Sequence, residues 1–157
     1  MIKQNDVRCL PVIRDIGCFF TCCGYIAERR PETRKRLKAT DLNATWKWAK
    51  ETKRINDEDN VKDSASIATR FLRLLGDEKG RFIEVGLFKD GITQYYPAYK
   101  GTPLARIDAL IQKIEQNGPN KYHFRVVNKK GCLIEDPHEP EIGVQKVCYS
   151  ILYAYEG

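Results

Sequence analysis

The sequence is poor in the residues from which structural metal sites are built. It contains two histidines, His123 and His138, and none of its six cysteines forms a Cys-x2-Cys pair. Structural zinc sites usually combine such pairs with further thiol or imidazole ligands. We therefore expect no metal ion, and no motif in the chain indicates a bound cofactor.

Long apolar segments are also missing. No run of about 18 apolar residues occurs, as a transmembrane helix would require. The chain starts with Met-Ile-Lys-Gln-Asn-Asp, without the apolar core of a secretory signal. These absences predict a cytoplasmic protein that does not act at a membrane. In the cytosol its cysteines are expected to be reduced.

The composition is otherwise that of an ordinary folded protein. Apolar residues make up 42% of the 157 residues and charged residues 31%, a balance typical of globular rather than disordered chains. This length suits one domain with one core, spanning residues 1–157.

Much of the net charge of +6 lies in one segment, from Arg29 to Lys38. Such a basic segment favours acidic partners, including nucleic acid. A solvated helix face or loop would produce the same pattern. We favour this second interpretation, because no aromatic and basic recognition motif accompanies the segment.

Periodicity and turn residues divide the chain into a helical first half and a strand-rich second half. Apolar spacing predicts helices at 18–30, 42–53 with Asp41 as N-cap, 64–75 and 104–116. Extended segments are predicted at 9–13, 81–88, 92–96, 122–127, 132–136 and 147–155. This order indicates an α+β fold, in which N-terminal helices pack on a mainly antiparallel C-terminal sheet.

Cys18 begins the uncharged helical segment, directly after Gly17. A thiol at a helix N-terminus experiences the positive end of the helix dipole, which favours the nucleophilic thiolate. Gly17 leaves the approach to the sulfur open. Core packing is the alternative role for Cys18, and it is the expected role of Cys22 and Cys23 in the same helix.

His123 and Asp136 fall on neighbouring predicted strands. If Lys129 and Lys130 form a two-residue loop, the two side chains are cross-strand neighbours on one face. A bulge at Gly131 would shift this register by one residue. A carboxylate beside an imidazole fixes its tautomer, and the imidazole can then exchange a proton with a thiol. His138, which follows in a polar loop, is expected to face solvent.

These segments resemble a known family. Gly17-Cys18-Phe19-Phe20-Thr21 is similar to the nucleophile segment of papain-like cysteine peptidases that process bacteriocin leaders, and of their phage-associated relatives. Asp41-Leu42-Asn43-Ala44-Thr45-Trp46 resembles a Leu-Asn element of that family. His123-Phe124-Arg125-Val126-Val127 and Ile134-Glu135-Asp136-Pro137 resemble its His and Asp-Pro strands. The whole chain also resembles an uncharacterised bacterial and prophage family.

The resemblance implies a papain-like fold and a peptide or protein substrate or partner. Cys18 would be the nucleophile, His123 the general base and acid, and Asp136 the orienting group. The family usually carries a glutamine a few residues before the nucleophile, which donates to the oxyanion. No glutamine lies between Asn5 and Cys18 here, and Asp15 occupies the nearest place. The backbone N–H of Cys18 is then the other oxyanion donor.

Three functional hypotheses follow from the sequence. The first is a cysteine peptidase, amidase or acyl-transfer enzyme that uses Cys18, His123 and Asp136. The second is a catalytically inactive papain-like binding protein, encoded by a mobile element. The third is a nucleic-acid-binding protein that uses the segment from Arg29 to Lys38.

Overall fold

The computed structural model describes residues 1–117, 121–137 and 144–157. Within these ranges the fold is α+β, as predicted, with the helices first in the chain. The helices are α1 (Pro11–Ile16), α2 (Cys18–Glu28), α3 (Ala39–Glu51) and α4 (Ser64–Leu74). The strands are β1 (Arg81–Lys89), β2 (Ile92–Tyr95), β3 (Ile107–Gln116), β4 (Tyr122–Val127), β5 (Leu133–Glu135) and β6 (Val144–Glu156).

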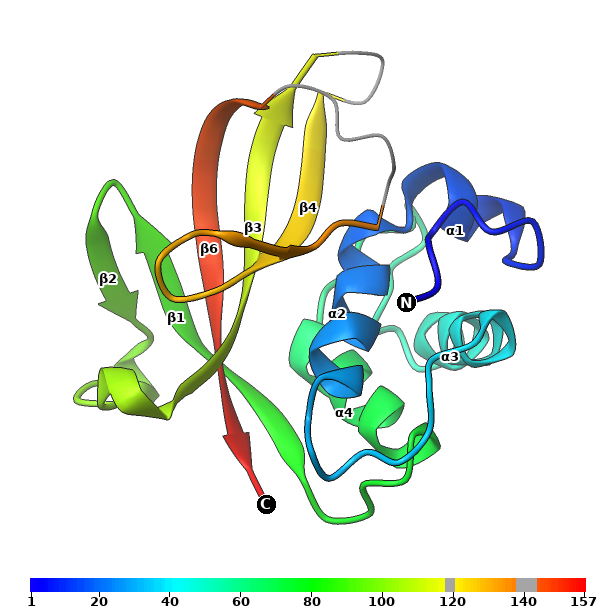
Figure 1. The fold of residues 1–157 in the computed structure, drawn as a ribbon, viewed down its shortest axis with the longest axis horizontal. Helices are drawn as coiled ribbons and strands as arrows, with labels where there is room; N and C mark the ends of the chain where they lie inside the picture. Colours follow the sequence, from blue (N-terminus) through cyan, green and yellow to red (C-terminus); the bar gives the residue numbers. More distant parts are fainter. Residues whose placement is uncertain (118–120, 138–143) are drawn as a thin grey trace.

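The strands of the described ranges form one antiparallel sheet of six, in the order β2-β1-β6-β3-β4-β5. The C-terminal strand β6 therefore lies in the middle, between β1 and β3. Figure 1 shows the helices gathered on one side of this sheet. Helix α2 packs against β4, and α4 packs against both α2 and β1.

The main core fills the space between helices and sheet. It includes Phe20 of α2, Phe71 of α4 and Tyr153 of β6, which are at most 1% exposed. A smaller cluster covers the other face of the sheet and includes Leu110 and Leu152. The sheet is thus apolar on both faces, so its central strands need not alternate between apolar and polar residues.

The predictions for α2 and α4 are confirmed within two residues at each end. Gly76 ends the α4 region with a φ of +104°, which glycine adopts without steric cost. Gly24 lies inside α2 because of a close contact. A Cβ at this position would be 2.7 Å from Cδ2 of Leu37.

Helix α3 begins three residues earlier than predicted, at Ala39. Asp41 is not the N-cap but the third helical residue, and its carboxylate accepts a hydrogen bond from the backbone N–H of Lys38 at 2.9 Å. This is the reciprocal half of a capping box. Asp41 therefore takes part in capping the start of α3, as predicted, but it does so from the third helical residue and not from the N-cap position.

Two predicted elements are wrong. Residues 104–116 form a short 3-10 turn (Leu104–Arg106) followed by strand β3, not a helix. Leu110 and Ile111 belong to the hydrophobic clusters on opposite faces of the sheet. Because the strand is buried on both faces, its apolar residues do not alternate with polar ones, and their spacing resembles that of a helix. Residues 11–13 belong to α1 and are not extended. Pro11 occupies the first turn, where its missing N–H needs no partner.

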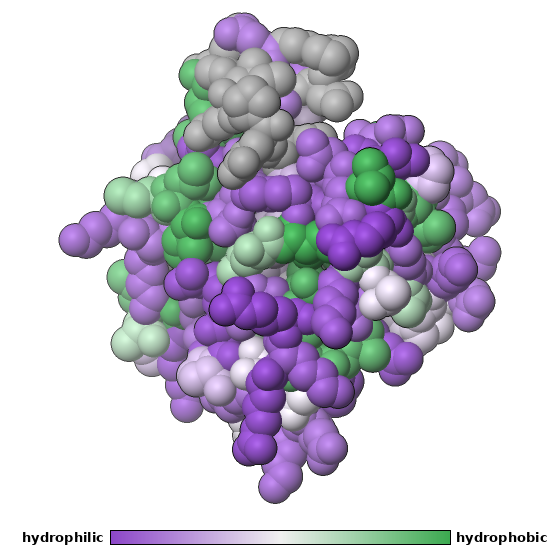
Figure 2. All heavy atoms as spheres, turned by 45° about the vertical axis from the view of Figure 1, so that its right-hand side comes forward, coloured by the Kyte–Doolittle hydropathy of each residue, from purple (hydrophilic) through white to green (hydrophobic). Residues whose placement is uncertain are grey.

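The helical side of the molecule is mainly hydrophilic at its surface, with apolar side chains exposed in small groups (Figure 2). Across the described residues, no helix has both the length and the apolar character that a membrane crossing requires. The same ranges contain no group of three or more His, Cys, Asp or Glu side chains placed to hold a metal ion.

Candidate active site

Cys18 is the first residue of α2, and its thiol is partly exposed. Its N-cap residue, Gly17, has no side chain that could cap the backbone N–H groups of the first turn. A Cβ on Gly17 would lie 2.5 Å from the backbone oxygen of Ile13, so glycine is required by the tight junction between α1 and α2. The uncapped turn leaves the positive end of the helix dipole at Cys18.

His123 and Asp136 form a buried hydrogen-bonded pair. Nε2 of His123 lies 2.6 Å from Oδ1 of Asp136, and the two residues are only 2% and 6% exposed. His123 lies on β4, opposite Ile114 of β3, and Asp136 directly follows β5. Burial of either group alone would be unfavourable, so each depends on the other for compensation of its lost hydration.

The predicted contact between these side chains forms, but the predicted strand register is wrong. A two-residue loop would place Val126 opposite Leu133, whereas the structure pairs Val126 with Glu135. Val127 pairs with Leu133, which is already one residue away from the two-residue-loop register, as the alternative with a bulge at Gly131 allowed, and an irregularity between Val127 and Val126 adds the second residue. Asp136 therefore lies beyond the end of β5, and its carboxylate reaches back to His123.

The surroundings of His123 raise the pKa of its imidazole from 6.5 to about 9. Burial lowers this pKa, but hydrogen bonds to Asp136 and to the Cys18 thiol, together with the charges of both groups, outweigh the effect of burial. The imidazole is consequently protonated at neutral pH. The structure thus brings Cys18, His123 and Asp136 together from α2, β4 and the end of β5.

The other cysteines of α2 differ from Cys18 in environment. Cys22 and Cys23 are fully buried, which confirms their predicted role in core packing. Burial is the largest cause that raises the pKa of both thiols, and the neighbouring Cys18 adds to the effect at Cys22. Both thiols therefore stay protonated and unreactive, and Cys18 is the thiol of this helix that has access to solvent.

The N-terminal segment holds the chain that carries Asp136. The Lys3 ammonium lies 2.5 Å from Oε1 of Glu135 and donates to the backbone oxygen of Asp136 at 2.7 Å. The backbone N–H of Gln4 donates to the carbonyl of Pro137 at 3.0 Å. These contacts fix the position of Asp136. The sequence alone did not indicate them, because neither residue belongs to a periodic pattern or a motif.

The side chain of Gln4 is fully buried beside α1. Its Nε2 donates to the carbonyl of Arg14 at 3.2 Å, whereas its Oε1 has no hydrogen-bond partner among the described residues. Gln4 lies far before Cys18 in the sequence, outside the few residues in which the resembled family carries its oxyanion-binding glutamine. In the structure the Gln4 amide nitrogen is engaged by α1.

Asp15 lies exposed in the last turn of α1. An ionised carboxylate has no proton to donate, so the backbone N–H groups at the start of α2 are better suited to an oxyanion. The Leu42-Asn43 element supports this region from α3. Oδ1 of Asn43 accepts from the backbone N–H of Leu10 at 2.8 Å, and its Nδ2 donates to the carbonyl of Arg8 at 2.9 Å.

A cavity of about 340 Å³ lies beside Phe19, the residue after the thiol. It is lined by Phe19, Val61, Lys62, Ser64, Glu84, Leu87, Tyr96, Tyr149 and Ile151. The Phe19 ring stacks on Phe124, the residue after His123, with ring centroids 4.4 Å apart. The cavity therefore adjoins α2, which carries Cys18, and Phe19 connects it to β4, which carries His123.

Glu84 is the carboxylate of this cavity. It accepts a hydrogen bond from the Tyr96 hydroxyl at 3.0 Å. Burial, the largest influence, raises the pKa of Glu84. Lys62 lines the same cavity, but no ion pair joins it to Glu84 in the described part of the chain.

The basic segment that follows α2 is a loop. Arg29, Arg34, Lys35, Arg36 and Lys38 are exposed. Arg30 differs from them, because its guanidinium pairs with Glu32 and Asp108 and lies 3.7 Å from the centre of the Tyr155 ring. His138, which the sequence placed in solvent, lies outside the described residues.

Comparisons with protein-family models, curated proteins and solved structures return no match to this chain. The case for its function therefore rests on the geometry of the site.

Replacement of Asp136 with Asn tests the electrostatic role of this carboxylate. The variant retains the size of the side chain but loses its charge, so the pKa of His123 should fall from about 9 by about 1 or more. An NMR titration of the imidazole signals measures this value, and a His123→Gln variant assigns the His123 signal. A wild-type pKa near 6.5, or one that Asp136→Asn does not change, would contradict the described environment.

The same pKa predicts how stability depends on pH. The folded-state pKa of about 9 exceeds the ordinary value of 6.5, so the stabilisation is complete below pH 6.5 and is lost as the pH rises through 9. The free energy of unfolding in urea should therefore fall over this interval, and fall less in Asp136→Asn. Equal slopes in the two proteins would count against the assignment.

Proposed function

We propose that this protein is a cysteine-dependent hydrolase or acyl-transfer enzyme that acts on a peptide or amide bond. The observation that carries the proposal is the contact series from the partly exposed Cys18 thiol to His123 and from His123 to Asp136. A thiol, an imidazole and an orienting carboxylate are the groups that nucleophilic cysteine catalysis requires. A papain-like fold agrees with the arrangement of helices on an antiparallel sheet.

The imidazole would take part through its Nδ1. Asp136 engages Nε2, so the proposed exchange of a proton with the thiol uses Nδ1. The Cys18 sulfur, with its proton held by His123, attacks the substrate carbonyl carbon and forms a tetrahedral intermediate. The imidazolium then protonates the leaving amine as the C–N bond breaks. Water or a second amine attacks the resulting thioester and releases Cys18.

The negative oxygen of the tetrahedral intermediate would face the N-terminus of α2. The backbone N–H of Cys18 is a donor there, and the helix dipole adds to its effect. No contribution is assigned to the Asp15 carboxylate. A site that relies on backbone donors alone would turn over about 10²–10³ more slowly than one with an additional side-chain donor.

The cavity beside Phe19 suggests the class of substrate. Glu84 is a half-buried carboxylate that forms no ion pair among the described residues, and a positive charge in the cavity would stabilise its ionised form. A lysine or arginine side chain, with an apolar stem against Phe19 and Leu87, satisfies both the charge and the apolar lining. We therefore expect preference for a peptide with a basic residue near the bond that is cleaved.

A catalytically inactive binding protein is the second candidate. The observation in its favour is the exposed Asp15 carboxylate at the place where the resembled family carries an oxyanion donor. Such a protein would bind its peptide partner without cleavage, and Cys18→Ala would bind as well as the wild type.

Cys18→Ala distinguishes the two candidates. A library of peptides is incubated with the wild type, Cys18→Ala and the matched control Cys132→Ala, which removes an exposed thiol outside the site. We expect cleavage by the wild type and by the control, and complete loss in Cys18→Ala, because the other thiols of α2, Cys22 and Cys23, are fully buried. Turnover that persists in Cys18→Ala, or binding without any cleavage, would refute the catalytic proposal.

The preference for basic residues is tested with Glu84→Gln. This variant should lose selectivity for peptides with lysine or arginine by about tenfold, which corresponds to the loss of one partly buried ion pair. Lys62→Gln is the matched control and should retain the preference. An unchanged cleavage profile in Glu84→Gln would show that the cavity does not bind the basic side chain.

A further inference from the structure

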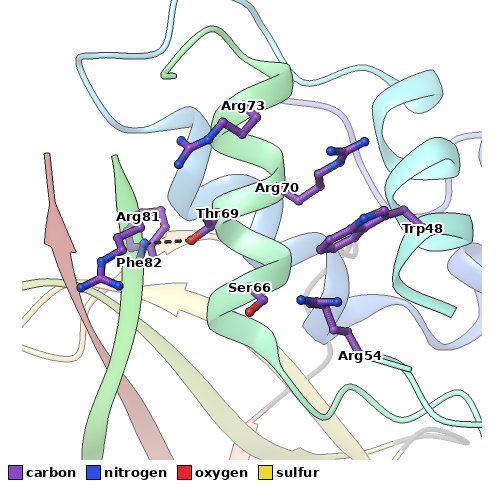
Figure 3. A pocket seen from close by; sticks show the side chains of 8 residues that line it. All are labelled: Trp48, Arg54, Ser66, Thr69, Arg70, Arg73, Arg81 and Phe82. Carbon is purple, nitrogen blue, oxygen red and sulfur yellow. Dashed lines mark hydrogen bonds between the residues drawn. The ribbon is translucent and has the colours of Figure 1, made fainter. Parts of the chain in front are cut away.

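A second hollow, about 360 Å³ in volume, lies across α4 and is rich in arginine (Figure 3). Its lining contains four arginines and no carboxylate: Trp48, Arg54, Ser66, Thr69, Arg70, Arg73, Arg81 and Phe82. Figure 3 shows Arg70 and Arg73 projecting from α4, with Trp48 and Arg54 on one flank and Arg81 on the other. The lining thus presents concentrated positive charge around one hollow.

Two of these arginines have carboxylates nearby. Arg81 forms an exposed ion pair with Glu156 at 2.7 Å, and Arg54 lies at 3.9 Å from Asp63, with its buried Nε otherwise without a partner in the described ranges. These contacts reduce the charge that the two side chains offer to a ligand, but they do not remove the donors of Arg54.

Arg70 and Arg73 are not neutralised in this way, since neither forms an ion pair with a described carboxylate. The Arg73 guanidinium is held by the carbonyls of Asp77 and Gly80, at 2.8 and 2.6 Å. The Arg70 guanidinium lies 5.2 Å from the centre of the Trp48 ring. Arg70 is therefore oriented by an aromatic ring and Arg73 by two carbonyls, and the charge of Arg73 also contributes to the lowered pKa of Asp77.

The basic loop after α2 contacts the C-terminal end of α4, where the carbonyl of Leu75 accepts hydrogen bonds from the backbone N–H groups of Arg34 and Lys35 at 2.8 and 3.1 Å. A separate hollow lies at this junction, and its lining combines Arg34 with the acidic residues Glu32, Asp77 and Glu78. Of these two hollows, the one across α4 has no carboxylate in its lining.

From this arrangement we infer that the hollow lined by Arg54, Arg70, Arg73 and Arg81 binds the phosphodiester backbone of a nucleic acid. Its guanidinium groups are spread around a hollow of about 360 Å³, more than a single phosphate engages, whereas a strand presents repeated phosphates. Guanidinium groups donate in pairs to phosphate oxygens. The Thr69 hydroxyl, which already accepts from the backbone N–H of Phe82 at 3.0 Å, retains its own proton for donation. This binding is independent of Cys18.

The test measures fluorescence anisotropy of a labelled single-stranded oligonucleotide of about 20 nucleotides, which exceeds a usual single-strand site. The wild type, Arg70→Gln/Arg73→Gln and the single variant Arg70→Ala are titrated between about 50 and 200 mM salt. The double variant should bind at least about tenfold more weakly at low salt, with a shallower dependence of log K on log salt, by about 0.7 for each lost phosphate contact. Arg70→Ala should show half of the change in slope. The double variant could also disturb the fold, because Arg73 holds the carbonyls of Asp77 and Gly80. Arg70→Ala leaves these hydrogen bonds intact and therefore separates a loss of binding from a folding defect.

Lys89→Gln/Lys100→Gln is the control, since it removes the same charge from exposed positions outside the hollow. Equal weakening by the control and by the arginine variant would overturn the inference, because general charge would then explain the binding. Equal binding by all variants would also overturn it. Two competitors test the class of ligand. If inorganic phosphate at the same phosphate concentration displaces the oligonucleotide, the hollow binds a small anion and not a nucleic acid. If poly-glutamate at the same charge displaces it, the hollow binds an acidic peptide.

Discussion

The hydrogen bond between His123 and Asp136 is the contact on which the candidate site depends. It connects β4 to the chain after β5, and it offsets the cost of placing an imidazole and a carboxylate out of water. The same bond leaves one ring nitrogen for the thiol and contributes to the raised pKa of His123. Several local features serve this contact. Lys3 and Gln4 hold the Asp136 segment, and Gly17 allows the close junction that starts α2 at Cys18.

Much of the site could be predicted because it depends on short-range signals. An uncharged helical segment after a glycine located Cys18 at the start of α2, and the strand pattern around His123 located β4. The pairing of His123 with Asp136 was predicted from an incorrect register and still occurs, because a side chain beyond a strand end can reach its neighbour. The prediction of this contact was therefore supported by the short chain segment between the two residues, and not by the predicted strand register.

The failures have physical causes that a single sequence does not display. Strand β3 was read as a helix because its apolar residues serve two cores, one on each face of the sheet. A proline disfavours helical dihedrals at the residue before it, which is Leu10 here, but it is compatible with the first position of a helix. Helix α1 therefore begins at Pro11, where an extended segment was predicted. The roles of Lys3 and Gln4 depend on contacts with residues more than 130 positions away, and no local pattern reports such contacts. The arginine hollow likewise combines α3, α4 and β1, which only the fold brings together.

The central claim is that Cys18 is activated by His123, and the rate of alkylation of each cysteine measures this most directly. The wild type and His123→Ala are treated with iodoacetamide between about pH 5 and 9, and each thiol is followed by peptide mass spectrometry. An ordinary thiol is only a few per cent ionised at pH 7. Cys18 should therefore react more than about tenfold faster there than the exposed Cys132, and it should lose this advantage in His123→Ala. If Cys18 reacts no faster than Cys132, or reacts equally fast without His123, the imidazole does not activate the thiol and the catalytic account is wrong.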